Sequence, residues 1–73
     1  RDRRYADITR EGLVRTMDLP RDLDEAGVLE RLDRLGDRPA PYSQIDHRLR
    51  TARTEAELVA AARQLHAWKD ALA

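Results

Sequence analysis

Apolar residues recur at steps of three and four along the last twenty residues of the chain, with polar residues between them. This spacing places the apolar side chains on one face of an α-helix. Just before the pattern, Thr54 and Glu57 stand three residues apart, as in a capping box. The sequence therefore predicts an amphipathic helix over residues 54–73. Its apolar face consists of Leu58, Ala61, Ala62, Leu65, Trp68 and Leu72.

A similar pattern predicts a first helix near the N-terminus. Asp7 or Thr9 is the expected N-cap, and the upstream residues, including Tyr5, either extend the helix or form a separate turn. The helix should end before Pro20, because a proline disfavours helical backbone in the residue before it. The residues expected to face inward are Leu13, Val14 and Met17.

A second helix is expected to begin at Asp22 or Asp24, since a carboxylate is favoured at a helix N-terminus. Gly36 suits the C′ position that closes a helix. Glu30 and Arg34 are four residues apart and should pair on the exposed face. The expected inward positions are Val28, Leu29, Leu32 and Leu35.

A third helix should follow the linker at residues 37–41, which holds two prolines and is therefore stiff and extended. Ser43 and Asp46 resemble a capping-box variant at its start. Its narrow apolar face would be formed by Ile45, Leu49 and Ala52.

These four segments, with no convincing strand, predict an all-α fold: a small irregular bundle of three to four helices. We expect residues 1–73 to form a single helical domain with the second and last helices packed antiparallel at its centre, because both carry leucine stripes. The chain contains no cysteine, so disulfides and thiolate metal sites are excluded. It begins at Arg1 rather than Met, which indicates a segment of a longer protein.

The charge composition bears on origin and partners. Fourteen basic residues balance fourteen acidic ones, which argues against coating nucleic acid by charge alone. Thirteen of the basic residues are arginine and eleven residues are alanine, a bias typical of a GC-rich bacterial genome. No apolar run approaches the length of a membrane span, so we expect a cytoplasmic location and no membrane partner.

Catalytic and metal-binding patterns are weak. Ser43, Asp46 and His47 lie close in sequence, but Ser43 is the expected helix cap and no glycine-rich turn offers an oxyanion hole. His47 and His66 are nineteen residues apart, without the short ligand spacing typical of zinc sites. We therefore expect no self-contained active site, no metal and no cofactor.

The C-terminal apolar face is the leading candidate for a functional surface. Trp68 and Leu72 are bulky residue types that anchor interfaces. The core of so short a chain is small, so part of this end should remain available to a partner. The prediction is a non-catalytic protein–protein interaction or oligomerisation module that binds its partner, or another copy of itself, through Trp68, Leu72 and Leu65.

The alternative is a small helix-turn-helix-like DNA-binding domain. Residues 8–13 resemble a turn that enters a recognition helix, with polar residues at its N-terminal end. Local basic strips could contact phosphate groups. The arginines assigned to this role form two alternative sets, either Arg10 and Arg15 or Arg48, Arg50 and Arg53.

Overall fold

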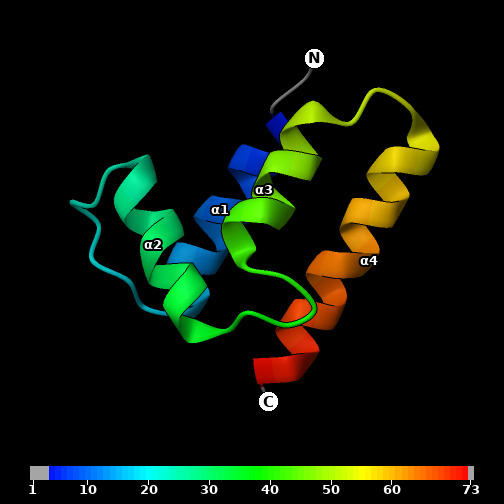
Figure 1. The fold of residues 1–73 in the computed structure, drawn as a ribbon. Coiled ribbons are helices and arrows are strands. Elements are labelled where there is room, and N and C mark those ends of the chain that lie inside the picture. The colour runs from blue at the N-terminus through cyan, green and yellow to red at the C-terminus, as the bar shows by residue number, and fades with distance from the viewer. Residues whose placement is uncertain (1–3, 73) are drawn as a thin grey trace.

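Four α-helices and their connections make up residues 4–72, which are the residues that this computed structural model describes (Figure 1). That range contains no β-strand. The helices are α1 (Arg4–Thr16), α2 (Glu25–Leu35), α3 (Tyr42–Thr51) and α4 (Glu55–Leu72). The predicted all-α bundle is confirmed. No helix in the described range is long and apolar enough to cross a membrane.

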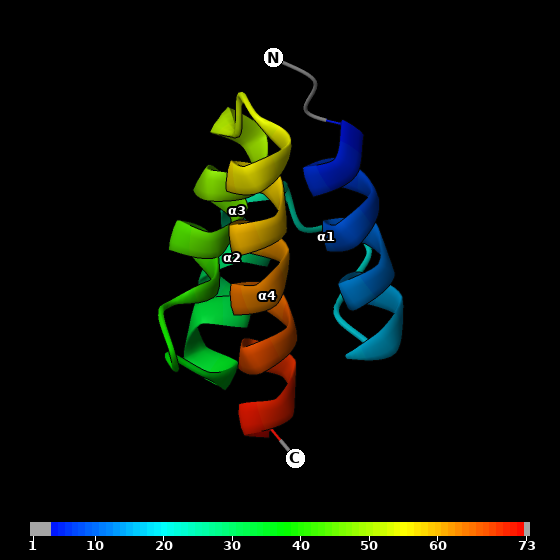
Figure 2. The ribbon, with the colours of Figure 1, turned by 90° about the vertical axis from the view of Figure 1, so that its right-hand side faces the viewer.

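The shortest helix, α3, lies at the centre of the bundle. It packs against each of the other three helices. Helices α1 and α4 run in one direction and α3 runs in the opposite direction (Figure 2). The expected central pairing of the second and last helices is therefore wrong. The physical reason is that α3, although only ten residues long, buries four of its side chains completely or almost completely: Tyr42, Ile45, Asp46 and Leu49.

The start of each helix shows how far local sequence rules hold. The N-cap of α2 is Asp24, whose carboxylate accepts a hydrogen bond from the Gly27 amide at 2.8 Å. The predicted Thr54 cap is also present, because its hydroxyl accepts from the Glu57 amide at 3.1 Å. The Glu57 carboxylate reaches back to the Arg53 amide, one residue earlier than the standard capping box.

The other two predicted starts are wrong. Helix α1 already includes Arg4, so Asp7 and Thr9 lie inside it instead of capping it. Helix α3 begins at Tyr42 after Pro41, and Ser43 does not cap it. The Ser43 amide donates instead to a carboxylate oxygen of Asp33 on α2, at 2.7 Å. A side chain from a neighbouring helix thus supplies the acceptor that the local sequence was expected to provide.

The predicted inward faces are largely confirmed. Leu13 of α1 and Val28 and Leu32 of α2 are buried. Leu35 is an exception, since 47% of its surface is exposed at the end of α2. On the outer side of α2, the predicted pair forms with an N–O distance of 3.1 Å between Arg34 and Glu30.

Gly36 ends α2 in a different way from the one predicted. Its φ of −169° is extended backbone, whereas the expected C′ glycine would be left-handed. Its carbonyl accepts a hydrogen bond from the indole Nε1 of Trp68 at 2.8 Å. A Cβ atom at this position would lie 2.8 Å from Leu72, which would then have to shift. Glycine serves here to let the C-terminal end of α4 approach the linker.

Candidate functional site

Trp68, the residue first expected to meet a partner, is fully buried in the chain's own core. Its ring packs against Tyr42, with 5.0 Å between the ring centroids and an interplanar angle of 56°. Leu65 is only 7% exposed, and Leu72 is partly buried against this core. The expectation that this end remains available is therefore wrong for Trp68, which the start of α3 and the end of α2 cover. Leu65 is likewise withdrawn into the core, although it was assigned to partner binding.

A buried carboxylate joins the helices at the centre of the bundle. Asp46 is completely buried on α3 and accepts from Arg10 on α1 at 2.9 Å and from Arg50 at 2.8 Å. Arg10 also donates to Asp7 at 2.7 Å and lies 3.7 Å from Glu25 of α2. One guanidinium thus links three helices.

The pKa directions follow from this arrangement. Burial by itself lowers the pKa of Arg10, but the surrounding carboxylates, Asp46 first, raise it above its ordinary value. Burial also raises the pKa of Tyr42, and the negative charge of Asp46 adds to this effect. Arg10 therefore stays positively charged and Tyr42 neutral, and the group acts as a fixed structural cluster.

Two of the five arginines assigned to nucleic-acid binding are therefore committed to internal ion pairs. Arg10 and Arg50 both bind Asp46 and are largely withdrawn from solvent. Asp46 and Arg50 are four residues apart, a spacing that is visible in the sequence and favours a pair on one helix. The sequence does not indicate that Asp46 and Arg50 are buried, because their burial depends on the residues of α1 and α2 that pack over them.

The remaining three arginines are exposed but dispersed. Arg48 lies on the last turns of α3, and Arg53 follows in the α3–α4 connection. Arg15 lies in the last turn of α1, at the opposite end of the bundle, because α1 and α3 run in opposite directions (Figure 2). Of the two expected sets, the first thus keeps only Arg15 exposed, and the second keeps Arg48 and Arg53.

A groove of about 430 Å³ runs between α1 and α4. The two helices flank α3 and make their main contacts to it, which leaves their facing sides apart. The floor holds Leu13, Met17 and Leu65, and the α1 side presents Thr9, Gly12 and Thr16. Lys69 lines the end of this groove near the C-terminus of α4. Apolar and polar groups line this groove in nearly equal measure, with small residues along one wall.

The N-terminal half of α1 carries two exposed apolar side chains along this groove. Tyr5 is 45% exposed and Ile8 is 59% exposed, the largest value among the exposed large hydrophobic residues of the described range. Tyr5 also lines a second hollow of about 280 Å³, which holds Leu58 and Glu55 at the start of α4. Tyr5 lines both hollows, and the second also includes Leu49 and Ala52 at the end of α3. The two hollows together are here called the α1–α4 groove.

Sequence reasoning did not find the α1–α4 groove. Ile8 was visible as an apolar residue next to the expected N-cap, but its exposure follows from the rotation of α1 about its own axis. Leu65 was correctly placed on the apolar face of α4. It forms part of the groove floor instead of an open anchor.

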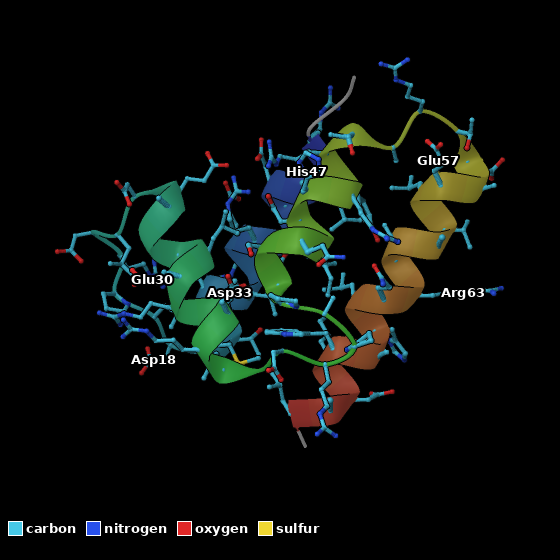
Figure 3. The ribbon with its side chains drawn as sticks, viewed as in Figure 1. Asp18, Glu30, Asp33, His47, Glu57 and Arg63 are labelled. Carbon is cyan, nitrogen blue, oxygen red and sulfur yellow. The ribbon has the colours of Figure 1, made fainter. Side chains whose placement is uncertain are left out.

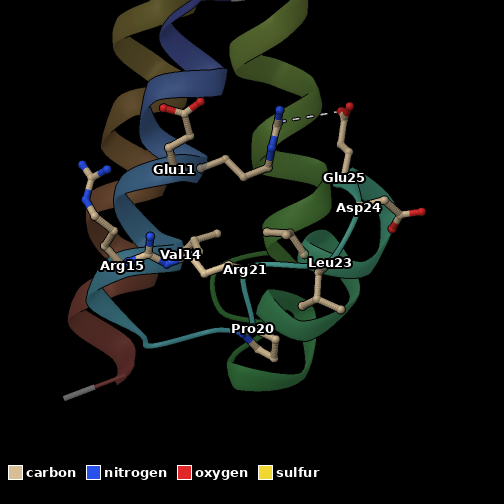
Figure 4. Close-up of a pocket in the computed structure, with 10 residues that line it drawn as sticks. Glu11, Val14, Arg15, Pro20, Arg21, Leu23, Asp24 and Glu25 are labelled. Atoms are coloured by element: carbon tan, nitrogen blue, oxygen red, sulfur yellow. Dashed lines mark ion pairs between the residues drawn. The ribbon is translucent and has the colours of Figure 1, made fainter.

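A third hollow, of about 350 Å³, lies between α1, α2 and their connection (Figure 4). Three arginines line it, at positions 10, 15 and 21, together with three acids, at positions 11, 24 and 25. Arg10 and Glu25 form an ion pair across it. Because these charges balance, the region has no net preference for an anion or a cation.

The candidate catalytic and metal-binding residues do not converge. Asp46 is buried and accepts from its two arginines. His47 is exposed on α3 (Figure 3). His66 is exposed on a different helix, α4. Within residues 4–72, no group of three or more His, Cys, Asp or Glu residues could hold a metal ion.

The groove has to be interpreted from its own residues. The sequence matches no model of a protein family, and searches of curated proteins and of solved structures find no match either.

Proposed function

We propose that this chain is a non-catalytic protein–protein interaction or oligomerisation module of a larger bacterial, cytoplasmic protein, and that it binds a helical partner along the α1–α4 groove. The observation that carries the proposal is the exposure of Tyr5 and Ile8 on the edge of a channel with an apolar floor. Contiguous exposed apolar surface rimmed by polar residues marks interaction sites more often than scattered apolar residues do.

The shape of the groove suits a helix. Helices α1 and α4 are parallel to each other and antiparallel to α3 (Figure 2). Helices of a partner can therefore lie antiparallel along α1 and α4, as α3 does on the inner side.

The energetic contribution of the two exposed side chains is appreciable. Complete burial of an isoleucine stabilises by about 1.5–3 kcal/mol. Since 59% of Ile8 is still exposed, a partner that covers it would gain about 1–2 kcal/mol from this residue alone. Tyr5 adds a second contribution of similar size. Together the two residues would contribute about 2–3 kcal/mol to a partner that covers both.

Site-specific photo-crosslinking tests this proposal. Benzoylphenylalanine at position 8 reports on the groove, and the same residue at position 35 on α2 is a matched control, because Leu35 is similarly exposed outside it. We expect covalent adducts from position 8, in an extract of cells that express the protein, and few from position 35. Equal labelling from both positions, or none from position 8, would contradict the proposal.

The alternative function, DNA binding, has less support. Arg48 and Arg53 are exposed near the end of α3, but Glu57 lies beside Arg48 in the same surface hollow. Phosphate contacts by these two arginines would give affinity that falls between about 50 and 200 mM salt. Fluorescence anisotropy with labelled duplex DNA measures this, and R48A/R53A should abolish it. The absence of binding at about 50 mM salt would exclude the alternative.

A further inference from the structure

We propose that the partner at the α1–α4 groove is the same face of a second copy of this chain, with α1 packed on α1 and α4 on α4 about a two-fold axis that makes the helices of the two copies antiparallel. This inference rests on the proposed function and names the partner. Two properties of the groove support it: the order of large and small residues along α1 and the order of charges along α4. A third support is that both orders place the two-fold axis at the same level of the bundle.

Helix α1 presents large residues at one end of the groove and small ones at the other. Tyr5 and Ile8 lie in its N-terminal half, whereas Gly12 and Thr16 lie in its C-terminal half. In an antiparallel copy, Ile8 of one chain faces Gly12 of the other, and Tyr5 faces Thr16. Each protruding side chain then meets a recess, and a two-fold interface requires such self-complementarity.

Gly12 has no reason within its own chain to be glycine. A Cβ atom built at this position meets nothing within 4 Å, and the residue lies inside α1, where glycine is a poor helix former. Close approach of a second backbone is a physical reason for a glycine at an open helical position. A neighbouring copy with Ile8 at this point provides that approach.

The charges along α4 also favour an antiparallel copy. Glu55 lines the groove at the start of α4, and Lys69 lines it near the other end. In the antiparallel arrangement, Glu55 of each chain faces Lys69 of the other. The helix dipoles act in the same direction, because the positive N-terminal ends of α1 and α4 approach the negative C-terminal ends of the partner. Arg53 lines the Glu55 end as well, so the charge preference is moderate.

Both sets of pairs require the same two-fold axis. The pairing of Ile8 with Gly12 places the axis at the level of residue 10 on α1. The pairing of Glu55 with Lys69 places it at residue 62 on α4, an alanine that leaves room for a close crossing. Tyr5 shares one hollow with Leu58, and the 12–16 stretch of α1 shares the other with Leu65. Residue 10 therefore lies level with the middle of α4, near residue 62.

The area of this face sets the expected affinity. Helix α1 has 13 residues and is therefore about 20 Å long, and two adjacent helices are about 20 Å wide. The interface would bury on the order of 800–1,000 Å² in total, at the lower limit for a specific complex. We therefore expect a weak dimer with a dissociation constant of about 10–500 µM.

Sedimentation equilibrium of the purified chain from about 10 µM to 1 mM tests this inference. We expect the mass to rise from the 8.4 kDa of one chain toward twice that value. Ile8→Lys should weaken the dimer at least tenfold, whereas Leu35→Lys, a change of an exposed leucine on α2, should leave it within twofold.

Gly12→Gln separates dimerisation from folding. The substitution fills the recess that Ile8 of the partner would enter, so the dimer should weaken at least tenfold. Glutamine is also a better helix former than glycine, so the melting temperature of the monomer should rise. A dimer that survives both Ile8→Lys and Gly12→Gln would overturn the inference, because its interface would then lie elsewhere.

A charge exchange tests the antiparallel direction. Lys69→Glu places like charges opposite each other twice in every dimer and should weaken it about three- to tenfold at low salt. Adding Glu55→Lys to the same chain restores opposite charges and should recover the affinity. Failure of the double variant to recover, while circular dichroism shows intact helices, would contradict the proposed direction.

The failure of this inference is distinguishable from the failure of the proposed function. A strict monomer up to 1 mM, together with adducts from position 8 to a different protein, would overturn the second copy and leave the groove as a binding site. A strict monomer without adducts from position 8 would overturn both. Adducts between two copies of this chain support both.

Discussion

The buried ion-pair cluster provides the sharpest stability prediction. Replacing Asp46 by alanine removes the acceptor of two charge-assisted hydrogen bonds, one from Arg10 and one from Arg50. The side chains of these arginines are only 13% and 26% exposed, so each would lose its partner in a poorly hydrated position.

The magnitude follows from the exposure of the partners. Removing one member of a fully buried pair costs about 3–5 kcal/mol. Arg10 keeps Asp7 and Glu25 as partners, and Arg50 is able to turn partly toward solvent, so we expect about 2–3 kcal/mol for Asp46→Ala. For a chain of 73 residues, this corresponds to a fall in melting temperature of about 10–20 °C.

The assay is urea denaturation followed by circular dichroism, with Arg34→Ala as the control. That variant breaks the pair with Glu30, whose side chains are 71% and 66% exposed. We expect the control to cost no more than about 0.5 kcal/mol. A cost below about 1 kcal/mol for Asp46→Ala, close to that of the control, would refute the conclusion that the cluster holds α1 against α3.

Three further predictions concern the core and one helix start. Trp68→Ala should destabilise the fold by about 3–5 kcal/mol, because it removes the ring packed on Tyr42 and the bond to the Gly36 carbonyl; thermal melting that shows an unchanged midpoint would contradict this. Tyr42→Phe should be neutral or stabilising by up to about 1 kcal/mol, since the hydroxyl is buried without a hydrogen-bond partner among the described residues. The pKa of Tyr42 is raised in the folded protein, so the contribution of this residue to stability is complete below its unfolded pKa of about 10 and declines at higher pH. Urea titrations from pH 8 to 11 should therefore show a fall in the free energy of unfolding that Tyr42→Phe reduces. An equal fall in both proteins would argue against this prediction. Thr54→Ala should cost about 1 kcal/mol in the same urea assay, because the Glu57 amide loses its acceptor; a cost near zero would show that this cap is dispensable.

The α1–α4 groove and the ion-pair cluster depend on the same helix. Arg10 directs one side of α1 toward Asp46 and the core. This fixes the rotation of α1 and leaves Tyr5 and Ile8 on another side, toward the groove. The cluster therefore helps to decide which residues of α1 are offered to a partner, although it contacts no partner itself.

The positions of the helices and most of their inward faces were determined by the sequence alone. The three- and four-residue spacing that ends at Trp68, the Asp24 cap and the Thr54 cap are local properties, which need only the geometry of one helix. A local rule failed where a distant side chain replaced it, as at Ser43, whose amide is bound by Asp33 of another helix.

Only the tertiary structure decided which surface remained open. An apolar stripe indicates that one face of a helix is buried, but not which element packs against it. Trp68 was thus expected at a surface and lies in the core, because the end of α2 and the start of α3 close over it. Ile8 was exposed by the rotation of α1 toward Asp46. Such choices depend on contacts between residues far apart in sequence, and the pattern within a single helix does not contain them.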